Sequence, residues 1–395
     1  MEHWGYMGKI LEVDLSRETV RTLPLPSALS GRALAAQLML KSLSGGEGAL
    51  SEENVVVIAT ALLTLTGAPA SARFDIASLS PRDGCPAIAN CGGALGLMLR
   101  RAGYDALLLR GRCRGLRLLE IDNGYVNFCD AESLRGVETD RCTDLLSKEK
   151  PGSAVLCIGP AGENYVNFAS VFANGHSTGR AGFGAVLGWK NLKAIRIKGE
   201  GKLPLCDEER VRALSCAWAA SLREARREEG DNCCTACPLH CARQGRGEDP
   251  LLDALGMDAI AAGRAAERFA GCGLSREELF TAMAHGRIDV NERRSGEREN
   301  KLKSGKRRKG SFEAVLRAFE LPDDEESALF CRRFTEAVSV SGQCMFTLKA
   351  LKKGELPMLD MLQAVTGKPY TLEDFLAMGE ESLRLERELK ARFEK

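Results

Sequence analysis

The chain has 395 residues, with 55 Lys and Arg residues against 54 Asp and Glu residues, and it contains 15 cysteines. Hydrophobic residues make up 44% and charged residues 28%, which is ordinary globular usage and excludes a disordered chain. A net charge of +1 gives no overall field that would attract nucleic acid or an anionic membrane. Apolar runs are too short to span a bilayer and the first residues lack a secretory pattern, so we expect a cytoplasmic protein.

The first 204 residues alternate short strand-like and helical segments. Residues 9–15 and 20–25 alternate apolar and polar side chains, which predicts a hairpin. Helical spacing of apolar residues predicts helices over residues 31–43, 93–101 and 133–148. Short apolar runs predict further strands over residues 55–59, 74–78, 106–109, 116–121, 155–158 and 194–197. Because short strands outnumber helices, we predict an α+β fold rather than a regular βαβ array.

The pattern changes at Leu203 and Pro204, where we place a boundary between a domain of residues 1–204 and a region of residues 205–395. Beyond the boundary, helical periodicity covers residues 207–229, 252–270, 311–319, 324–340 and 371–394. Residues 291–310 contain nine Lys and Arg residues and no aromatic side chain. Because single-stranded nucleic acids are usually bound by aromatic stacking, a solvated loop is favoured there over a nucleic-acid-binding tail.

The cysteines are densest between residues 233 and 241. An odd number of cysteines in a cytoplasmic chain predicts reduced thiols rather than a disulfide framework. Cys234, Cys237 and Cys241 form C-x2-C-x3-C, a spacing that lets three thiolates converge on a cubane iron–sulfur cluster. Zinc, with His240 as a ligand, is the competing metal, and chance clustering is the third interpretation.

A cluster would need a fourth ligand from elsewhere in the chain. Cys344 lies in a turn of small residues that could approach a cluster, and it fits best. Cys272 and Cys331 lie in helical contexts that are typical of packing residues.

Three glycine-rich segments of the first domain combine Gly with Arg or Asn. They contain Arg73, then Asn90 with Gly92 and Gly93, and finally residues 179–184. Glycine lets backbone N–H groups approach a phosphate, and arginine adds a bidentate contact. Because neither a Walker lysine nor a dinucleotide fingerprint is present, these segments favour a phosphorylated cofactor other than a nucleotide.

These segments resemble the aldehyde ferredoxin oxidoreductases, which are tungsten-dependent bis-pterin enzymes. The matching residues follow one another in order through residues 4–200. They are Trp4-Gly5 and residues 13–16, 70–74, 90–93, 102–106, 158–164, 175–188 and 190–195. The number of ordered matches excludes chance similarity.

The resemblance implies an N-terminal double β-sheet domain that binds two dithiolene pterins chelating tungsten or molybdenum. The metal then takes its sulfur ligands from the pterins and needs no protein cysteine. In the family, a set of motif positions holds the pterin phosphates and a bridging magnesium. The residues of this chain that match those positions are Arg73, Asn90, Gly92, Gly93, Arg180, Ala181 and Gly182. Magnesium prefers the phosphate, carbonyl and water oxygens that such turns provide.

The resemblance extends to the second region, which it implies to be mostly α-helical and reduced relative to the family. It implies a [4Fe-4S] cluster bound by Cys234, Cys237, Cys241 and Cys344. The family's pterin-binding motif D-x-x-G-L-[DC] appears as residues 253–258, which include Asp253, Gly256 and Asp258. A second copy, residues 339–344, has Ser339 in place of Asp and Gln343 in place of Leu.

The chain departs from the family in length and in its acid–base groups, and we expect a shortened member. The histidine segment of the family's active site has no counterpart among the four histidines, so no catalytic residue is assigned. We expect His176 and His240 to have local structural roles, and His285 lies in a helical context. Glu248 is nearest in position to the family's acidic residues.

The resemblance implies an oxidoreductase that oxidises an aldehyde to a carboxylic acid and passes electrons to ferredoxin or another iron–sulfur carrier. The alternative is a truncated, non-catalytic member that binds cofactor and cluster as an electron-transfer subunit. A homodimer and a partner subunit both remain open. A zinc-dependent nucleic-acid-binding protein is the third and least favoured interpretation.

Overall fold

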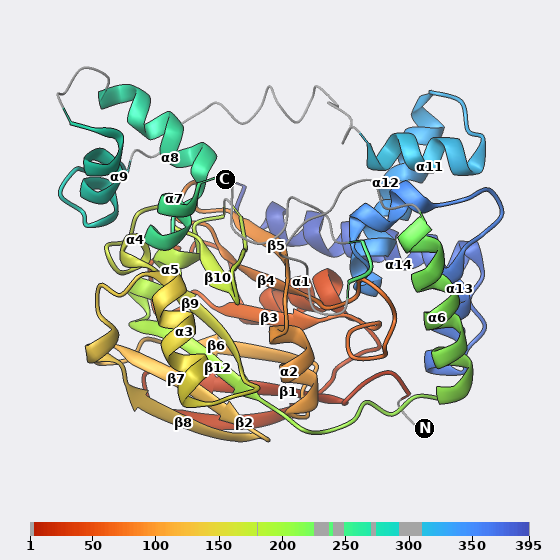
Figure 1. Ribbon diagram of the computed structural model, residues 1–395, viewed down its shortest axis with the longest axis horizontal. Helices are drawn as coiled ribbons and strands as arrows, with labels where there is room; N and C mark the ends of the chain where they lie inside the picture. Colours follow the sequence, from red (N-terminus) through yellow and green to blue (C-terminus); the bar gives the residue numbers. More distant parts are fainter. Residues whose placement is uncertain are drawn as a thin grey trace.

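The computed structural model describes residues 4–179, 181–224, 237–239, 249–269, 274–291 and 310–394 (Figure 1). Two β-sheets form the base of the molecule, and helices of the second half of the chain flank this base on two sides. Within the described ranges, no helix combines the length and hydrophobicity needed to cross a bilayer.

The first sheet is built entirely from residues before position 111. Its strands are β1 (Lys9–Asp14), β2 (Thr19–Pro24), β3 (Val56–Thr60), β4 (Arg73–Leu79), β5 (Pro86–Gly92) and β6 (Ala106–Arg110). Their order is β2-β1-β6-β3-β4-β5, and only β1 and β6 pair in parallel. At the β4–β5 edge, Arg73 lies opposite Gly92 and Asp75 lies opposite Asn90. This register brings two of the predicted cofactor segments together.

The second sheet follows in the chain. Its strands are β7 (Arg117–Asp122), β8 (Tyr125–Asp130), β9 (Ala154–Ile158), β10 (Val171–Ala173), β11 (His176–Ser177) and β12 (Leu192–Lys198). Their order is β11-β10-β9-β12-β7-β8, with β7 and β12 parallel and the other pairs antiparallel. The predicted α+β class with a double β-sheet domain is therefore confirmed.

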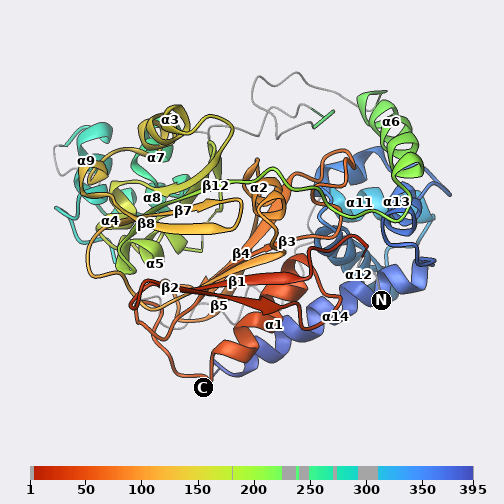
Figure 2. The ribbon, with the colours of Figure 1, turned by 90° about the horizontal axis from the view of Figure 1, so that it is seen from below.

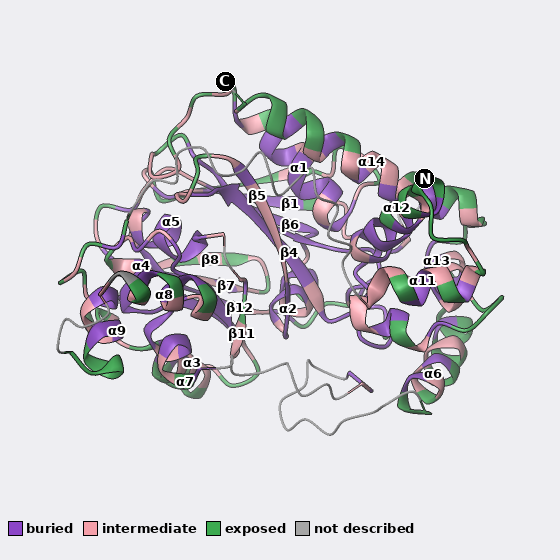
Figure 3. Cartoon of the chain, turned by 90° about the horizontal axis from the view of Figure 1, so that it is seen from above, coloured by how far each residue is buried: buried purple, intermediate pink, exposed green. Residues whose placement is uncertain are grey.

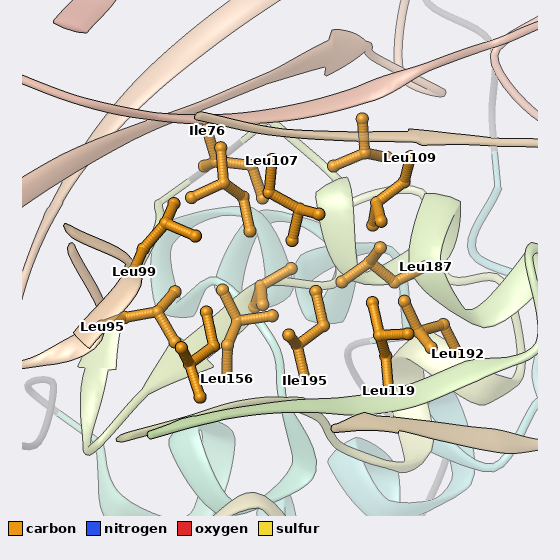
Figure 4. Close-up of a cluster of buried hydrophobic side chains, with 14 of the residues drawn as sticks. Ile76, Leu95, Leu99, Leu107, Leu109, Leu119, Leu156, Leu187, Leu192 and Ile195 are labelled. Carbon is orange, nitrogen blue, oxygen red and sulfur yellow. The ribbon is translucent and has the colours of Figure 1, made fainter. Parts of the chain in front are cut away.

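One hydrophobic core joins the two sheets. Ile76 and Leu107 from the first sheet and Leu119, Leu156 and Ile195 from the second belong to the same buried cluster (Figure 4). Helices α2 (Leu95–Arg101) and α5 (Phe183–Trp189) also contribute side chains to it. Removing this apolar surface from water is the main force holding the sheets together.

The described helices beyond residue 205 divide into two groups on opposite sides of the sheets (Figures 1 and 2). Helices α7 (Pro250–Leu255), α8 (Ala259–Ala266) and α9 (Arg276–Ala284) pack near α3 (Thr139–Glu149) and α4 (Pro160–Glu163). The other group comprises α6 (Glu208–Glu224), α11 (Ser311–Phe319), α12 (Glu325–Ser341), α13 (Pro357–Thr366) and α14 (Leu372–Ala391). Helices α12 and α14 pack on α1 (Gly31–Ser42), and their buried sides face it (Figure 3).

Most predicted elements are present, with two differences in the helices. The segment 133–148 begins as a short 3-10 helix, Glu132–Leu134, and α3 starts only at Thr139. The segment 252–270 is divided at Gly256, whose φ of 79° ends α7, because a left-handed residue cannot continue a helix. The domain boundary at residue 204 stays a prediction, and nearly all of the basic segment 291–310 lies outside the described residues.

Candidate functional site

A row of polar side chains crosses the β4–β5 edge. Arg73, the first residue of β4, donates from Nε to the Asn90 side-chain oxygen on β5. The Asn90 amide nitrogen donates to Asp75 Oδ1 at 3.0 Å and to the Phe74 carbonyl at 3.3 Å. Alternation along β4 puts residues 73 and 75 on one face of the strand, so the three side chains can reach one another. Arg73 and Asn90, predicted as two separate segments, thus form one unit.

Cys344 follows the C-terminal end of α12 and lies next to this row of side chains. The Leu63 N–H donates to the Ser341 carbonyl at 2.9 Å, and the Cys344 N–H donates to the Ala70 carbonyl at 3.1 Å. These bonds attach the segment after α12 to the loop that precedes β4. As a result, the Arg73 guanidinium donates to the Cys344 sulfur at 3.8 Å, although the two residues are 271 positions apart.

A second predicted ligand lies in the same place. Cys237 and Cys344 are both buried and form one small cluster with Ala70. Cys234, Cys241 and His240 lie outside the described residues, and so does Glu248. In the ranges that the structure describes, no three metal-ligating side chains converge. Two of the four predicted cluster ligands are therefore brought together, beside a guanidinium.

His176 lies next to Gly93, at the end of β5, and the sequence did not predict this contact. A Cβ atom at Gly93 would lie 3.1 Å from His176 Cδ2, and the Cys91 thiol donates to the His176 carbonyl at 3.4 Å. Burial and the nearby positive charge of Arg73 lower the pKa of His176 below its usual value. The imidazole is thus favoured in its neutral form next to the predicted anion site.

Asp75 is a further site residue that sequence reasoning missed. Its side chain is fully buried, and burial raises the pKa of its carboxyl to about 7, against the opposing effects of Arg32 and Asn90. Its Oδ2 atom has no hydrogen-bond partner among the described residues. The available signal was the single carboxylate of β4, which stands between the apolar Phe74 and Ile76.

Ala181 and Gly182 lie away from Arg73. Gly182, with φ of 77°, precedes α5, and a Cβ atom there would collide with the Asn167 carbonyl and the ring of Pro81. Pro81 follows the end of β4 opposite to Arg73, and a strand of this length spans roughly 20 Å. Arg180 lies outside the described residues.

The predicted pterin motif of residues 253–258 packs on the same side as Gly182. The Asp258 carboxylate caps α8 by accepting from the Ala261 N–H at 2.8 Å. The Asp253 carbonyl accepts from the Thr139 hydroxyl at 2.8 Å. The Gly256 carbonyl accepts from the Ser170 N–H at 2.9 Å. These contacts hold the motif against α3 and the segment before β10, and its binding of the pterin stays a prediction.

The predicted site residues therefore fall into two groups, one at the Arg73 end of β4 and one around Gly182 and the segment before β10. One group contains Arg73, Asn90, Gly92, Gly93, Cys237 and Cys344. The other contains Ala181, Gly182, Asp253, Gly256 and Asp258. The first group can hold an anion and a thiolate-ligated group. In the second group, other backbone atoms lie close to Gly182 and Gly256, the Asp253 side chain is buried, and the Asp258 carboxylate caps α8.

Comparisons with known proteins agree with this architecture. Residues 10–199 match the family described as aldehyde ferredoxin oxidoreductase, N-terminal domain. The tungsten-containing aldehyde ferredoxin oxidoreductase of Pyrococcus furiosus is 34% identical over 215 residues, which is 52% of this chain and 36% of that protein. The protein of the same name from Thermococcus kodakarensis is 36% identical over 216 residues, again 52% of this chain and 36% of that protein.

Two other proteins are similar. The WOR-like subunit of an aliphatic sulfonate oxidoreductase from Pyrococcus furiosus is 34% identical over 237 residues, or 53% of this chain and 37% of that protein. Among solved structures, the active-site complex BamBC of benzoyl coenzyme A reductase, in complex with 1,5-dienoyl-CoA, superimposes with a TM-score of 0.78. That match covers 100% of this chain and 90% of the other at 18% identity, so it shows a shared fold. Residues 10–199 thus belong to the family of aldehyde ferredoxin oxidoreductase N-terminal domains.

Proposed function

We propose that the chain binds a tungsten- or molybdenum-pterin cofactor and a [4Fe-4S] cluster, and that it oxidises an aldehyde to the carboxylic acid. The observation that carries this proposal is the contact of Arg73 with both Asn90 and Cys344, with Cys237 buried beside Cys344. The names of the curated relatives, which are tungsten-containing aldehyde ferredoxin oxidoreductases, support the choice of cofactor and substrate.

The described residues fit these groups. Arg73 offers a guanidinium to a pterin phosphate, and the backbone at Gly92 and Gly93 can approach the same phosphate closely. Carbonyl oxygens in these turns and phosphate oxygens are ligands that magnesium accepts. Cys237 and Cys344 would hold the cluster together with Cys234 and Cys241, and Arg73 would offset the negative charge of the thiolates.

The reaction balances as aldehyde plus water giving carboxylic acid, two protons and two electrons. The pterin-bound metal supplies the two-electron chemistry when it is bound, and the cluster supplies one-electron transfer. The chain's own part is to position the aldehyde and the reacting water and to accept protons. We propose that the electrons leave through the cluster to ferredoxin or another iron–sulfur carrier.

A second candidate function is a cofactor-binding and electron-transfer subunit without turnover of its own. It is favoured because the relatives match over only 36–37% of their length and one of them is named a subunit. The histidines of the described ranges also supply no evident acid–base group: His176 lies against Gly93, and His285 ends α9. In this case a partner subunit would complete the active site.

Metal analysis of anaerobically purified protein tests both functions. We expect about four iron atoms per chain, as a [4Fe-4S] cluster requires, together with tungsten or molybdenum. Stoichiometric zinc without iron would contradict both functions. Aldehyde oxidation coupled to a viologen dye then separates them, because fully loaded protein without activity would favour the subunit.

The fourth cluster ligand can be tested by a matched pair of substitutions. Cys344→Ala should reduce the iron content, because it removes a thiolate beside Cys237 and Arg73. Cys331→Ala is the control, since Cys331 is also buried but lies in α12 near the Phe312 carbonyl. Equal iron content in the two variants would show that Cys344 is not a ligand.

A further inference from the structure

The Asp75 carboxyl group stands at the start of a continuous chain of contacts that ends at the Cys344 sulfur. Asp75 Oδ1 accepts from Asn90, Asn90 accepts from Arg73, and Arg73 donates to Cys344. Asp75 and Asn90 are directly opposite in the β4–β5 register, and Arg73 is the diagonal neighbour of Asn90. The spacing of the sheet therefore fixes the order of the contacts.

The carboxylate decides which way the Asn90 amide points. The Asp75 Oδ1 atom accepts a hydrogen bond, so the amide end that faces it is the NH2 group. The amide oxygen is then presented to Arg73 Nε, which can only donate. The reversed amide would place oxygen against oxygen at Asp75 and two N–H donors against each other at Arg73. Without the acceptor at position 75, this orientation loses one of its three hydrogen bonds and keeps those to the Phe74 carbonyl and to Arg73.

A fixed Nε orients the rest of the guanidinium, because the group is planar and rigid. With Nε held by Asn90, the Nη1 atom lies 3.8 Å from Cys344 Sγ. We propose that Asp75 is a positioning residue: its carboxylate fixes the Asn90 amide and thereby holds the Arg73 guanidinium against the Cys344 sulfur. The positioning of Arg73 does not depend on a bound cluster, whereas its effect on electron transfer rests on the proposed function.

A purely structural role explains Asp75 less well. Its Oδ2 atom is buried without a hydrogen-bond partner among the described residues, which carries a desolvation penalty that an apolar residue would avoid. The other buried members of β4 are the apolar Phe74, Ile76, Ala77 and Leu79 and the hydrogen-bonded Ser78. A carboxylate at position 75 therefore lowers the stability of the core, while it provides the acceptor that orients Asn90.

Exchange of the Arg73 Nε–H proton with water tests the positioning directly, in the full chain without bound metal. The proton is observed by NMR of arginine-labelled protein and assigned by its loss in Arg73→Lys. In Asp75→Leu and Asp75→Ala, exchange should be at least about tenfold faster, since one hydrogen bond of the relay is lost. Asp75→Asn, which keeps an acceptor oxygen, should restore slow exchange.

Ser78→Ala is the matched control on the same strand, because it also removes a buried hydrogen bond of β4 but lies remote from Arg73. It should leave the exchange of the Arg73 proton unchanged. Unchanged exchange in folded Asp75→Leu and Asp75→Ala would overturn the proposal. Equal acceleration in Ser78→Ala would overturn it as well, because sheet stability would then be the cause.

The iron-loaded protein provides the functional readout. Arg73→Met removes a positive charge beside the cluster and should lower its reduction potential. Asp75→Leu should lower the potential relative to Asp75→Asn, which also lacks the carboxylate charge but keeps the acceptor, and this difference should vanish in the Arg73→Met background. If Asp75→Leu and Asp75→Asn have the same potential, the positioning of Arg73 by Asp75 is wrong. If the wild-type chain holds no iron, the proposed function fails, and the exchange measurement still decides the role of Asp75.

Discussion

At the scale of single residues, the structure distinguishes two kinds of glycine. Some have no room for a side chain, and others need only a backbone with positive φ. Gly182 and Gly179 both have φ near 80°. A Cβ atom at Gly182 would collide with the Asn167 carbonyl and with Pro81, whereas a Cβ atom at Gly179 would meet nothing within 4 Å. The sequence marks both residues as part of one glycine-rich segment and cannot tell them apart.

Gly182→Ala should therefore destabilise the protein more than Gly179→Ala. The backbone conformation alone costs about 1–2 kcal/mol for a non-glycine residue. Overpacking against Asn167 and Pro81 should add about 1–3 kcal/mol at Gly182. Urea unfolding of the two variants measures the difference. Equal losses of unfolding free energy would show that residues 167 and 81 move aside without cost.

At the scale of elements, an ion cluster joins α1, α12 and α14. Arg32 on α1 bonds to Glu336 on α12 at 3.0 Å and to Glu386 on α14 at 2.6 Å. Ser382 donates to the same Glu336 oxygen at 2.8 Å. Helical periodicity predicted all three helices, but their polar contacts depend on which faces meet, and that information is absent from any one segment.

Removing the cation of this cluster should weaken the packing of the three helices. Arg32→Met removes the guanidinium from the largely buried Glu336 and Glu386, and we expect a loss of about 3–5 kcal/mol in unfolding free energy. Adding Glu336→Gln and Glu386→Gln should recover part of the loss. Arg384→Met, which removes exposed ion pairs of α14, is the control and should change stability little. A small effect of Arg32→Met would show that water reaches the cluster.

Secondary structure was predictable where the local pattern is strong. The β1–β2 hairpin and the apolar strands β3, β4 and β6 follow from alternation and hydrophobicity. Strand β5 was missed because its sequence, PAIANCG, has no run of β-branched residues and is ordered by pairing with β4. Context of this kind overrides intrinsic propensity.

At the scale of the whole molecule, a buried lysine ties the two sheets together. Lys190 follows α5 on the side of the second sheet, and its Nζ donates to the carbonyls of Asn54 and Gly111 at 2.6 and 2.8 Å. Those carbonyls precede β3 and follow β6 of the first sheet. Burial lowers the pKa of Lys190 to about 8 from 10.5.

This pKa predicts the pH dependence of stability. Between pH 8 and 10.5 the unfolded chain binds more protons at Lys190 than the folded chain, so its contribution to stability rises with pH. We expect the unfolding free energy of the wild type relative to Lys190→Met to be flat below pH 8 and to rise above it, by at most about 3 kcal/mol. A difference that stays constant or falls between pH 8 and 10 would contradict the prediction. Unfolding curves at each pH provide the measurement.

The sequence by itself determined the fold class, most of the elements and the family of the N-terminal domain, because these depend on local patterns and on ordered motifs. It also singled out Cys344 and Arg73, each within its own segment. Only the tertiary structure placed Arg73 between Asn90 and Cys344, added Asp75 and His176, and separated Gly182 from Arg73 along β4. Strand register and helix docking decide such distances, and both arise from burial of surfaces that lie far apart in the chain.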